Sequence, residues 1–291
     1  MDKKPRRRLI PRFGIRWLLV FALIASVFFA WFARCCDRAK RETQLLDDIA
    51  AFNPGVTFNY EKNRMPGDPA VPPPGPEFLR DRFGDNLFAY VDSLTIHFNS
   101  STNAIPQDDV IDKIGGFRQL EVLSIRFSDA QDLSPIASIR TIEELDLILN
   151  EFSDYSCLQQ LPNLKKLSIG HPYVQIEDWT WLGEIESLES LDLSSSRINK
   201  LPSLLKLKNL EFLDLKNCSR LESTAPVADL KNLTRLSIGK GTPLQILDMV
   251  DQLPNLEFLD LQPYKQDKLS VAEIEGIRRR FPHAKVTYSH D

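Results

Sequence analysis

The heptapeptide NLEFLDL occurs twice in this chain, at residues 209–215 and again at residues 255–261, and the two starts lie 46 residues apart (255 − 209). A third stretch, NLTRLSI at residues 232–238, has the same apolar positions and divides this interval into two units of 23 residues. Extending the frame along the chain gives eight copies of an LxxLxL pattern. Their first residues are Val91, Leu120, Ile142, Leu164, Leu188, Leu210, Leu233 and Leu256.

The spacing of these copies predicts how the chain folds. Successive starts are 29, 22, 22, 24, 22, 23 and 23 residues apart. The alternating apolar residues of each copy predict one short strand, after which the chain returns through a turn and a short helix or loop. No single unit can bury its apolar side alone, so neighbouring units must stack into a continuous core beneath a parallel sheet. The fold class that we expect is therefore an α/β solenoid.

The pattern resembles the leucine-rich repeat, LxxLxLxxNxL, and the third copy at residues 142–152 matches it most fully. Asn150 holds the ninth place in that copy, whereas Ser196 and Cys218 hold it in the fifth and sixth copies. We expect Cys218 to be a small buried filler there. The repeat length of 22 to 24 residues resembles the short class also found in bacterial internalins. This resemblance implies a leucine-rich-repeat arc with a parallel sheet on its concave face.

A solenoid needs a cap at each end, because an exposed terminal repeat would present apolar core and an unpaired strand edge. Residues 270–291 are the expected C-terminal cap, since Ser270 and Glu273 have the spacing of a capping box and residues 284–288 alternate as a strand. Residues 77–88 are the candidate N-terminal cap, and residues 108–117 predict a longer helix on the convex side. The repeat domain as a whole is predicted over residues 78–291. The apolar residues of the candidate N-terminal cap are Phe78, Leu79, Phe83, Leu87 and Phe88.

An uncharged apolar run at residues 17–33 predicts a single transmembrane signal anchor that follows a basic tail, residues 1–16. Seven Lys and Arg residues precede the run and four follow it closely, which favours an N-terminus in the cytoplasm. A buried helix of a soluble protein and a cleaved signal peptide are the alternatives. The run is apolar on every side and ends in Ala33-Arg34-Cys35 rather than in an A-x-A site, which argues against both.

The segment between this anchor and the repeats has two predicted parts. Residues 34–60 read as a juxtamembrane helix followed by a short strand, and residues 61–77 read as a Pro-rich spacer. A role of the Pro-rich stretch as a ligand for aromatic grooves is the alternative. Cys35 and Cys36 would lie just outside the bilayer, either joined in a dimer disulfide or as two free thiols.

The order of basic tail, single span, short strand, Pro-rich segment and short repeats resembles membrane-anchored leucine-rich-repeat proteins of bacteria. This resemblance implies a single-pass protein of the bacterial inner membrane. Its N-terminus would be cytoplasmic, and its repeat domain would lie on the periplasmic side.

The outward positions of each predicted strand are the third and fifth places of the pattern. The fifth place is small or acidic in every copy, and the third place carries two phenylalanines with an arginine between them. Such aromatic and arginine side chains carry much of the binding energy at protein interfaces. In the alternative interpretation, the aspartates and serines merely solvate the sheet or bond to neighbouring strands. The candidate partner-binding residues are Phe212, Arg235, Phe258, Lys166, Asp192, Asp214 and Asp260.

The sequence carries no catalytic, metal or cofactor motif. His97 and His171 lie three repeats apart, too far to act together, and the acidic body after residue 41 makes nucleic acid an unlikely partner. We therefore expect a membrane-tethered protein-interaction module without catalytic activity or cofactor, which binds another protein on its concave face. The first alternative is a structural or adhesive envelope protein that binds cell-wall glycan, and the second is an enzyme.

Overall fold

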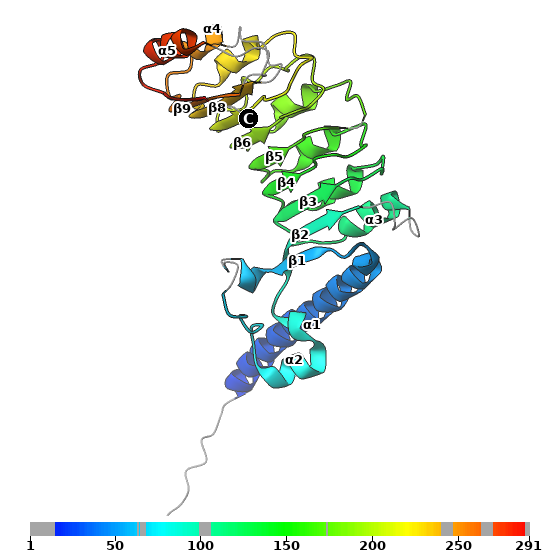
Figure 1. The fold of residues 1–291 in the computed structure, drawn as a ribbon. Coiled ribbons are helices and arrows are strands. Elements are labelled where there is room, and N and C mark those ends of the chain that lie inside the picture. The colour runs from blue at the N-terminus through cyan, green and yellow to red at the C-terminus, as the bar shows by residue number, and fades with distance from the viewer. Residues whose placement is uncertain are drawn as a thin grey trace, which may run out of the picture.

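The computed structural model describes residues 15–62, 64, 68–98, 106–172, 174–239, 247–262 and 270–288. The predictions for residues 1–14, for part of the Pro-rich segment and for residues 289–291 of the C-terminal cap fall outside these described residues. Figure 1 shows a long helix at one end of a curved stack of short strands, with helical turns along the opposite side of the stack.

The strands form one sheet in chain order, from β1 to β10. β1 pairs with β2 in antiparallel fashion, and every later pair, from β2–β3 to β9–β10, is parallel. This arrangement confirms the predicted parallel-sheet solenoid. The strands are β1 Gly55–Phe58, β2 Val91–His97, β3 Val122–Arg126, β4 Glu144–Asp146, β5 Lys166–Ser168, β6 Ser190–Asp192, β7 Phe212–Asp214, β8 Arg235–Gly239, β9 Phe258–Gln262 and β10 Lys285–Tyr288.

Short helices return the chain on the side opposite the sheet. The longest of those between repeat strands is α3, which spans Gln107–Ile114 in the 29-residue first interval, as expected. Pro135 and Pro226 are the second residues of two 3-10 helices, where the backbone N–H has no intrahelical partner and its absence costs no hydrogen bond. The other returns are η4 Ser134–Ser138, η5 Ser156–Gln160, η6 Thr180–Glu184, η7 Ala225–Asp229 and α4 Leu247–Val250.

The asparagine of the NLEFLDL heptapeptide connects adjacent repeats. Asn209 donates its side-chain amide to the carbonyl of Glu186 at 3.1 Å, and Asn255 donates to the carbonyl of Lys231 at 2.9 Å. The leucines that follow fill the core, since Leu210, Leu213 and Leu215 are all fully buried. Both asparagine hydrogen bonds lie at the surface, where they tie the backbone of one repeat to the next.

The ninth place of the repeat is buried whether or not it holds asparagine. Asn150 accepts the backbone N–H of Ser128 at 2.9 Å and donates to the carbonyl of Ile125 at 2.8 Å. Cys218 is fully buried at the same place, and its sulfur lies 3.1 Å from the carbonyl of Leu193. The expectation of a buried filler is confirmed, and the thiol also takes over one of the donor contacts of the amide.

A left-handed backbone turn follows the strand in five described repeats. The residues involved all stand at the eighth place, and none of them is glycine, although a side chain in this region costs roughly 1–2 kcal/mol. Stacking of the repeats therefore holds a conformation that the isolated chain disfavours. They are Phe127, Leu149, His171, Ser195 and Asn217, with φ between 48° and 62°.

The N-terminal cap is built from a different segment than expected. Helix α1 spans Ile15–Ile49 and continues into the 3-10 turn η1, Ala50–Phe52. Ile49 and Phe52 are buried in the repeat core, and β1 covers the open edge of β2. The predicted cap instead forms α2, Glu77–Phe83, and η3, Asp85–Leu87, whose Leu87 is buried while Phe78 remains 69% exposed.

The Pro-rich segment therefore has a different place in the domain order than we expected. It follows β1 and precedes β2, and these two strands are paired. In chain order, the spacer predicted at residues 61–77 therefore falls between two paired strands rather than ahead of the whole repeat domain. Residues 34–58 belong to the domain, because Ile49 and Phe52 are buried in its core and β1 pairs with β2.

Residues 270–288 form a helix and a strand at the C-terminal end of the sheet. Helix α5 spans Val271–Arg280, and the Ser270 hydroxyl accepts the backbone N–H of Glu273 at 3.2 Å. The Glu273 carboxylate accepts the backbone N–H of Ser270 at 2.7 Å, which completes the capping box. β10 then pairs in parallel with β9 and covers the last repeat strand.

Candidate functional site

The seven residues predicted for partner binding all lie on the strands of the parallel sheet. Lys166 lies on β5 and Asp192 on β6, and the other five lie on β7, β8 and β9. The register places residues of the same repeat position opposite each other on neighbouring strands, as with Lys166 opposite Ser190 and Asp192 opposite Asp214. The concave face consequently consists of straight columns of equivalent positions.

Three adjacent third-place residues form an aromatic–arginine patch, which we define as Phe212, Arg235 and Phe258. The register pairs Phe212 with Arg235, and Arg235 with Phe258. The guanidinium carbon of Arg235 lies 5.0 Å from the centre of the Phe258 ring, within the range of a cation–π interaction. Arg235 is exposed and both phenylalanines are half-buried, so the patch combines fixed rings with an accessible cation.

A groove of about 500 Å³ adjoins this patch and extends across the sheet from β3 to β7. Val122, Ile148 and Phe212 contribute apolar surface to it, and Lys166 and Asp192 are among its polar lining residues. Phe212 thus belongs to both the groove and the patch. The structure joins them into one continuous surface that a single extended partner could cover.

The fifth-place aspartates are engaged within the sheet. Asp192 accepts the backbone N–H of Ser194 at 2.8 Å and the hydroxyl of Ser168 at 3.3 Å. Asp146 accepts the hydroxyl of Ser124 at 3.2 Å, on the neighbouring strand β3. These bonds support the interpretation that fifth-place carboxylates stabilise the turns and neighbouring strands.

Asp214 has little surface left to offer a partner, because it is only 6% exposed. Lys216 Nζ lies 3.1 Å from the Asp214 carboxylate and 3.5 Å from that of Asp260, so one ammonium group joins two strands. Burial raises the pKa of Asp214 even though Lys216 acts to lower it. Burial acts to lower the pKa of Lys216, but the two carboxylates outweigh it and the net direction is upward.

The seventh place of the repeat contributes to this surface and was missed by the sequence pattern. Arg126 and Ile148 line the groove, and Lys216 joins Asp214 to Asp260. The Arg126 guanidinium donates through Nε to Asp146 at 3.0 Å. Extending the alternation of the third and fifth places by one step, past the end of LxxLxL, would have found these residues.

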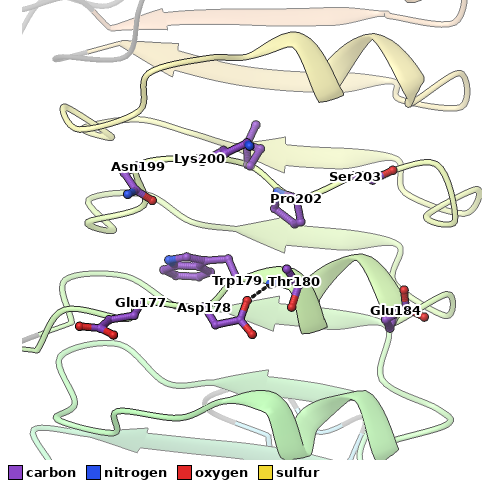
Figure 2. Close-up of a pocket in the computed structure, with 10 residues that line it drawn as sticks. Glu177, Asp178, Trp179, Thr180, Glu184, Asn199, Lys200, Pro202 and Ser203 are labelled. Atoms are coloured by element: carbon purple, nitrogen blue, oxygen red, sulfur yellow. Dashed lines mark hydrogen bonds between the residues drawn. The ribbon is translucent and has the colours of Figure 1, made fainter.

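A second pocket, of about 550 Å³, lies on the return side between η6 and residues 199–203 of the next repeat, as Figure 2 shows. Its Asp178 carboxylate accepts the backbone N–H of Thr180 at 2.8 Å, and this bonding lowers the pKa of Asp178. The Trp179 indole donates to the carbonyl of Ile176 at 3.2 Å. These two polar groups therefore serve to hold the 3-10 turn.

The described residues hold no group of three or more His, Cys, Asp or Glu side chains that could bind a metal ion. The His97 ring packs edge-on against Phe127, with 6.5 Å between the ring centres. His171 stands in the turn after β5, where its backbone is left-handed. The structure therefore does not bring these two histidines together.

Comparisons with known proteins agree with the repeat pattern. A family model described as leucine-rich repeats in two copies matches residues 186–229. The receptor-like protein EIX1 of Solanum lycopersicum is 32% identical over 108 residues, which is 35% of this chain and 10% of the relative. The leucine-rich repeat-containing G-protein coupled receptor 5 of Rattus norvegicus is 28% identical over 147 residues, which is 50% of this chain and 16% of the relative.

Among solved structures, a leucine-rich-repeat protein of Leptospira interrogans is 28% identical, with a TM-score of 0.49. The likeness covers 60% of this chain and 45% of that protein. The chain spans only 10% and 16% of the two curated relatives, so their whole activities do not transfer to it.

Stacked LxxLxL units beneath a parallel sheet define a leucine-rich-repeat solenoid. The described part of this chain has that fold, and residues 186–229 within it match the leucine-rich-repeat model. Proteins of this class act as protein-interaction modules and are typically not catalytic.

Proposed function

We propose that this chain is a membrane-tethered protein-interaction module that binds a protein partner on its concave face and has no catalytic activity of its own. The aromatic–arginine patch is the observation that carries the proposal. Aromatic and arginine side chains supply most of the binding energy at protein interfaces, and the register holds these three together on neighbouring strands.

The charges on this face narrow the chemistry of the partner. Lys166 is paired with Glu144 at 2.6 Å, and Arg126 donates to Asp146, so these charges already have protein partners. Arg235 has one face against the Phe258 ring and is otherwise exposed. A segment with an apolar side chain for the groove and a carboxylate for Arg235 would complement the surface.

The tether in this proposal is the first part of α1. Among the described residues, α1 is the one helix long and apolar enough to cross a membrane. Its apolar side chains are exposed, with Trp17 at 59%, Leu19 at 67% and Phe29 at 67%, whereas the core helix of a soluble protein would bury them. The charge balance supports an orientation with the N-terminus in the cytoplasm and the repeat domain on the periplasmic side of a bacterial inner membrane.

Photo-crosslinking in cells that produce the full chain tests the binding face. Benzoylphenylalanine at Phe212 or Phe258 is expected to form an adduct with one protein, and the same probe at the exposed Leu205, on the return side, is not. The Phe212→Ala/Arg235→Ala/Phe258→Ala variant should lose that partner in pull-down while its melting curve is unchanged. Undiminished binding of the partner by this variant contradicts the proposal.

Purified cell-wall glycan serves as the competing probe. Retention of the full chain on glycan that disappears in the triple variant, without any protein adduct, would support the structural or adhesive alternative instead. A C-terminal alkaline phosphatase fusion tests the orientation, because it is active only if the repeat domain leaves the cytoplasm.

A further inference from the structure

Exposed apolar side chains outside α1 concentrate in one short segment near the membrane end of that helix. The described residues contain six large apolar side chains of this kind, and three of them are Val71, Phe78 and Phe83, with exposures of 43%, 69% and 42%. The other three are spread along the repeats, at Phe127, Leu205 and Val271. Single exposed apolar residues are ordinary, but a local concentration marks an interaction surface.

Ring contacts place this segment at the end of the predicted span. The Phe32 and Phe83 rings pack edge to face with 5.4 Å between their centres, and the Trp31 and Phe88 rings stack at 6.2 Å. Trp31 and Phe32 belong to the last turn of the apolar run at residues 17–33. The segment therefore lies at the depth where the span would leave the bilayer (Figure 1).

The loop that precedes α2 is folded onto this site. Gly75 has a φ of 93°, and a Cβ on it would lie 2.1 Å from a ring carbon of Phe88, so the backbone lies directly on that ring. Arg80 donates through Nη1 to the carbonyl of Pro73 at 2.9 Å. These contacts give the segment a defined position beside α1.

The polar contacts that α1 makes with the rest of the described chain begin at the C-terminal end of this segment. Arg38 donates to the carbonyls of Leu87 and Ala89 at 3.3 and 3.2 Å. Glu42 accepts the backbone N–H of Val91 at 3.2 Å. Between Phe32 and Arg38 lie six residue steps, or roughly 9 Å of helix, which is the thickness expected of the lipid interface.

We propose that residues 71–88 form a second membrane contact, in which Val71, Phe78 and Phe83 enter the lipid interface beside α1. The inference rests on the proposed tether, and its partner is the phospholipid surface itself. An apolar cluster that continues the lipid-facing surface of α1 is buried once the bilayer surrounds that helix. Attachment at two points then fixes the tilt of the repeat stack against the membrane, which one helix alone leaves free.

Lipid photo-crosslinking of the full chain in phosphatidylethanolamine and phosphatidylglycerol liposomes tests this inference. We expect Phe78→benzoylphenylalanine to give a lipid adduct by mass spectrometry, as Phe21→benzoylphenylalanine in the span should. The exposed Leu205, replaced in the same way, is expected to give none. An adduct at position 21 without one at position 78 overturns the second contact and leaves the tether standing, and no adduct at position 21 refutes the tether.

An adduct of position 78 with protein rather than lipid would assign the segment to a second copy of the chain and overturn the proposal as well. A second measurement compares Val71→Ser/Phe78→Ser with the matched surface variant Leu205→Ser/Val271→Ser. In nanodiscs viewed by electron microscopy, the first variant should show a broadened range of repeat-domain tilts with an unchanged melting temperature. The same narrow range in both variants contradicts the inference.

Discussion

Buried carboxyl groups determine how the stability of this protein should respond to pH. Glu42, Asp92 and Asp214 are 3%, 2% and 6% exposed, and burial is the main cause that raises the pKa of each. A carboxyl group whose pKa is higher in the folded than in the unfolded state favours folding when it is protonated. Its stabilising contribution is complete below the unfolded pKa and is lost as the pH rises through the folded pKa.

Asp92→Asn tests this relation at one residue. Asp92 Oδ1 lies 3.7 Å from Lys62 Nζ, and the nearby Glu121 and Glu143 raise the pKa of Asp92 further after burial. We expect the variant to have a higher free energy of unfolding than the wild type at pH 7, because the buried charge is gone. The difference should shrink as the pH falls to 3.8, the ordinary pKa of an aspartate, because the raised pKa of wild-type Asp92 means that it is then protonated as well.

Urea unfolding of the detergent-solubilised full chain at pH 7 and pH 4 measures this difference. The exposed Asp129→Asn is the matched control and should leave the free energy of unfolding unchanged at both pH values. A less stable Asp92→Asn at pH 7 would mean that contacts of the ionised carboxylate outweigh its burial.

The two thiols of the repeat domain should be chemically inert in the folded protein. Burial raises the pKa of Cys157 to about 12 and that of Cys218 to about 11. Since the thiolate is the nucleophile, we expect iodoacetamide at pH 8 to leave both unmodified in the native chain and to modify both in urea, as followed by mass spectrometry. Rapid native modification of Cys218 would show that the sixth repeat opens frequently.

At the level of elements, α1 has two parts with opposite surroundings. Its first part exposes apolar side chains, whereas its second part buries Ala39, Glu42 and Ile49 against the repeat domain. One uninterrupted helix therefore serves as the proposed span and as the N-terminal cap. Without α1 the first repeat would have no N-terminal cap. The stability of the first repeats therefore depends on a segment outside the repeat pattern.

Ile49→Ala should expose this dependence. Ile49 is fully buried in the core, and truncating such a side chain costs about 2–5 kcal/mol of unfolding free energy. Leu19→Ala, at a side chain 67% exposed in the apolar part of the same helix, is the control and should leave unfolding of the repeats unchanged. Circular dichroism during urea titration in detergent measures both, and equal stability of the two variants would argue that the repeats fold without α1.

The regular part of the fold could be predicted from the sequence, whereas the cap and part of the site could not. The spacing of Leu210, Leu213 and Leu215 is enough to predict that they are buried. The apolar pattern of residues 77–88 is ambiguous, because a phenylalanine such as Phe78 can be buried in a protein core or lie at a lipid surface. Antiparallel pairing of β1 with β2 depends on contacts far apart in sequence. On the concave face, the residues at the third and fifth places of the repeat could be predicted from the motif. Those at the seventh place could not, because the LxxLxL motif ends at the sixth place.

At the scale of the whole molecule, the path of the chain determines what holds the repeat domain to the proposed anchor. A packed interface joins α1 to the repeat domain, in addition to the Pro-rich segment. It consists of the pairing of β1 with β2 and the burial of Ile49 and Phe52. A domain joined to its anchor by a spacer alone would separate from it once that spacer was cleaved. Here the covalent link runs beside a packed interface that can hold the two parts on its own.

A protease site inserted after Ala70 tests this arrangement. After cleavage of the full chain in detergent, we expect the two fragments to remain together in size-exclusion chromatography, because the β1–β2 pairing and the packing of α1 persist. The same cleavage in an Ile49→Ala/Phe52→Ala background should separate them. Separation of the fragments without these substitutions would show that residues 61–77 act as the tether.

The continuity of α1 also fixes a height. From Ala33 to Ile49 the helix continues for 16 residues (49 − 33), or roughly 24 Å, with no break in which its length could change. In a tethered chain this helix sets the height of the first repeat strand, because that strand begins beside Glu42, nine residues past Ala33 (42 − 33). A protein could reach the groove only if part of it lay at the height of the groove above the bilayer. The distance of a protein from the membrane would therefore be the first property that selects partners.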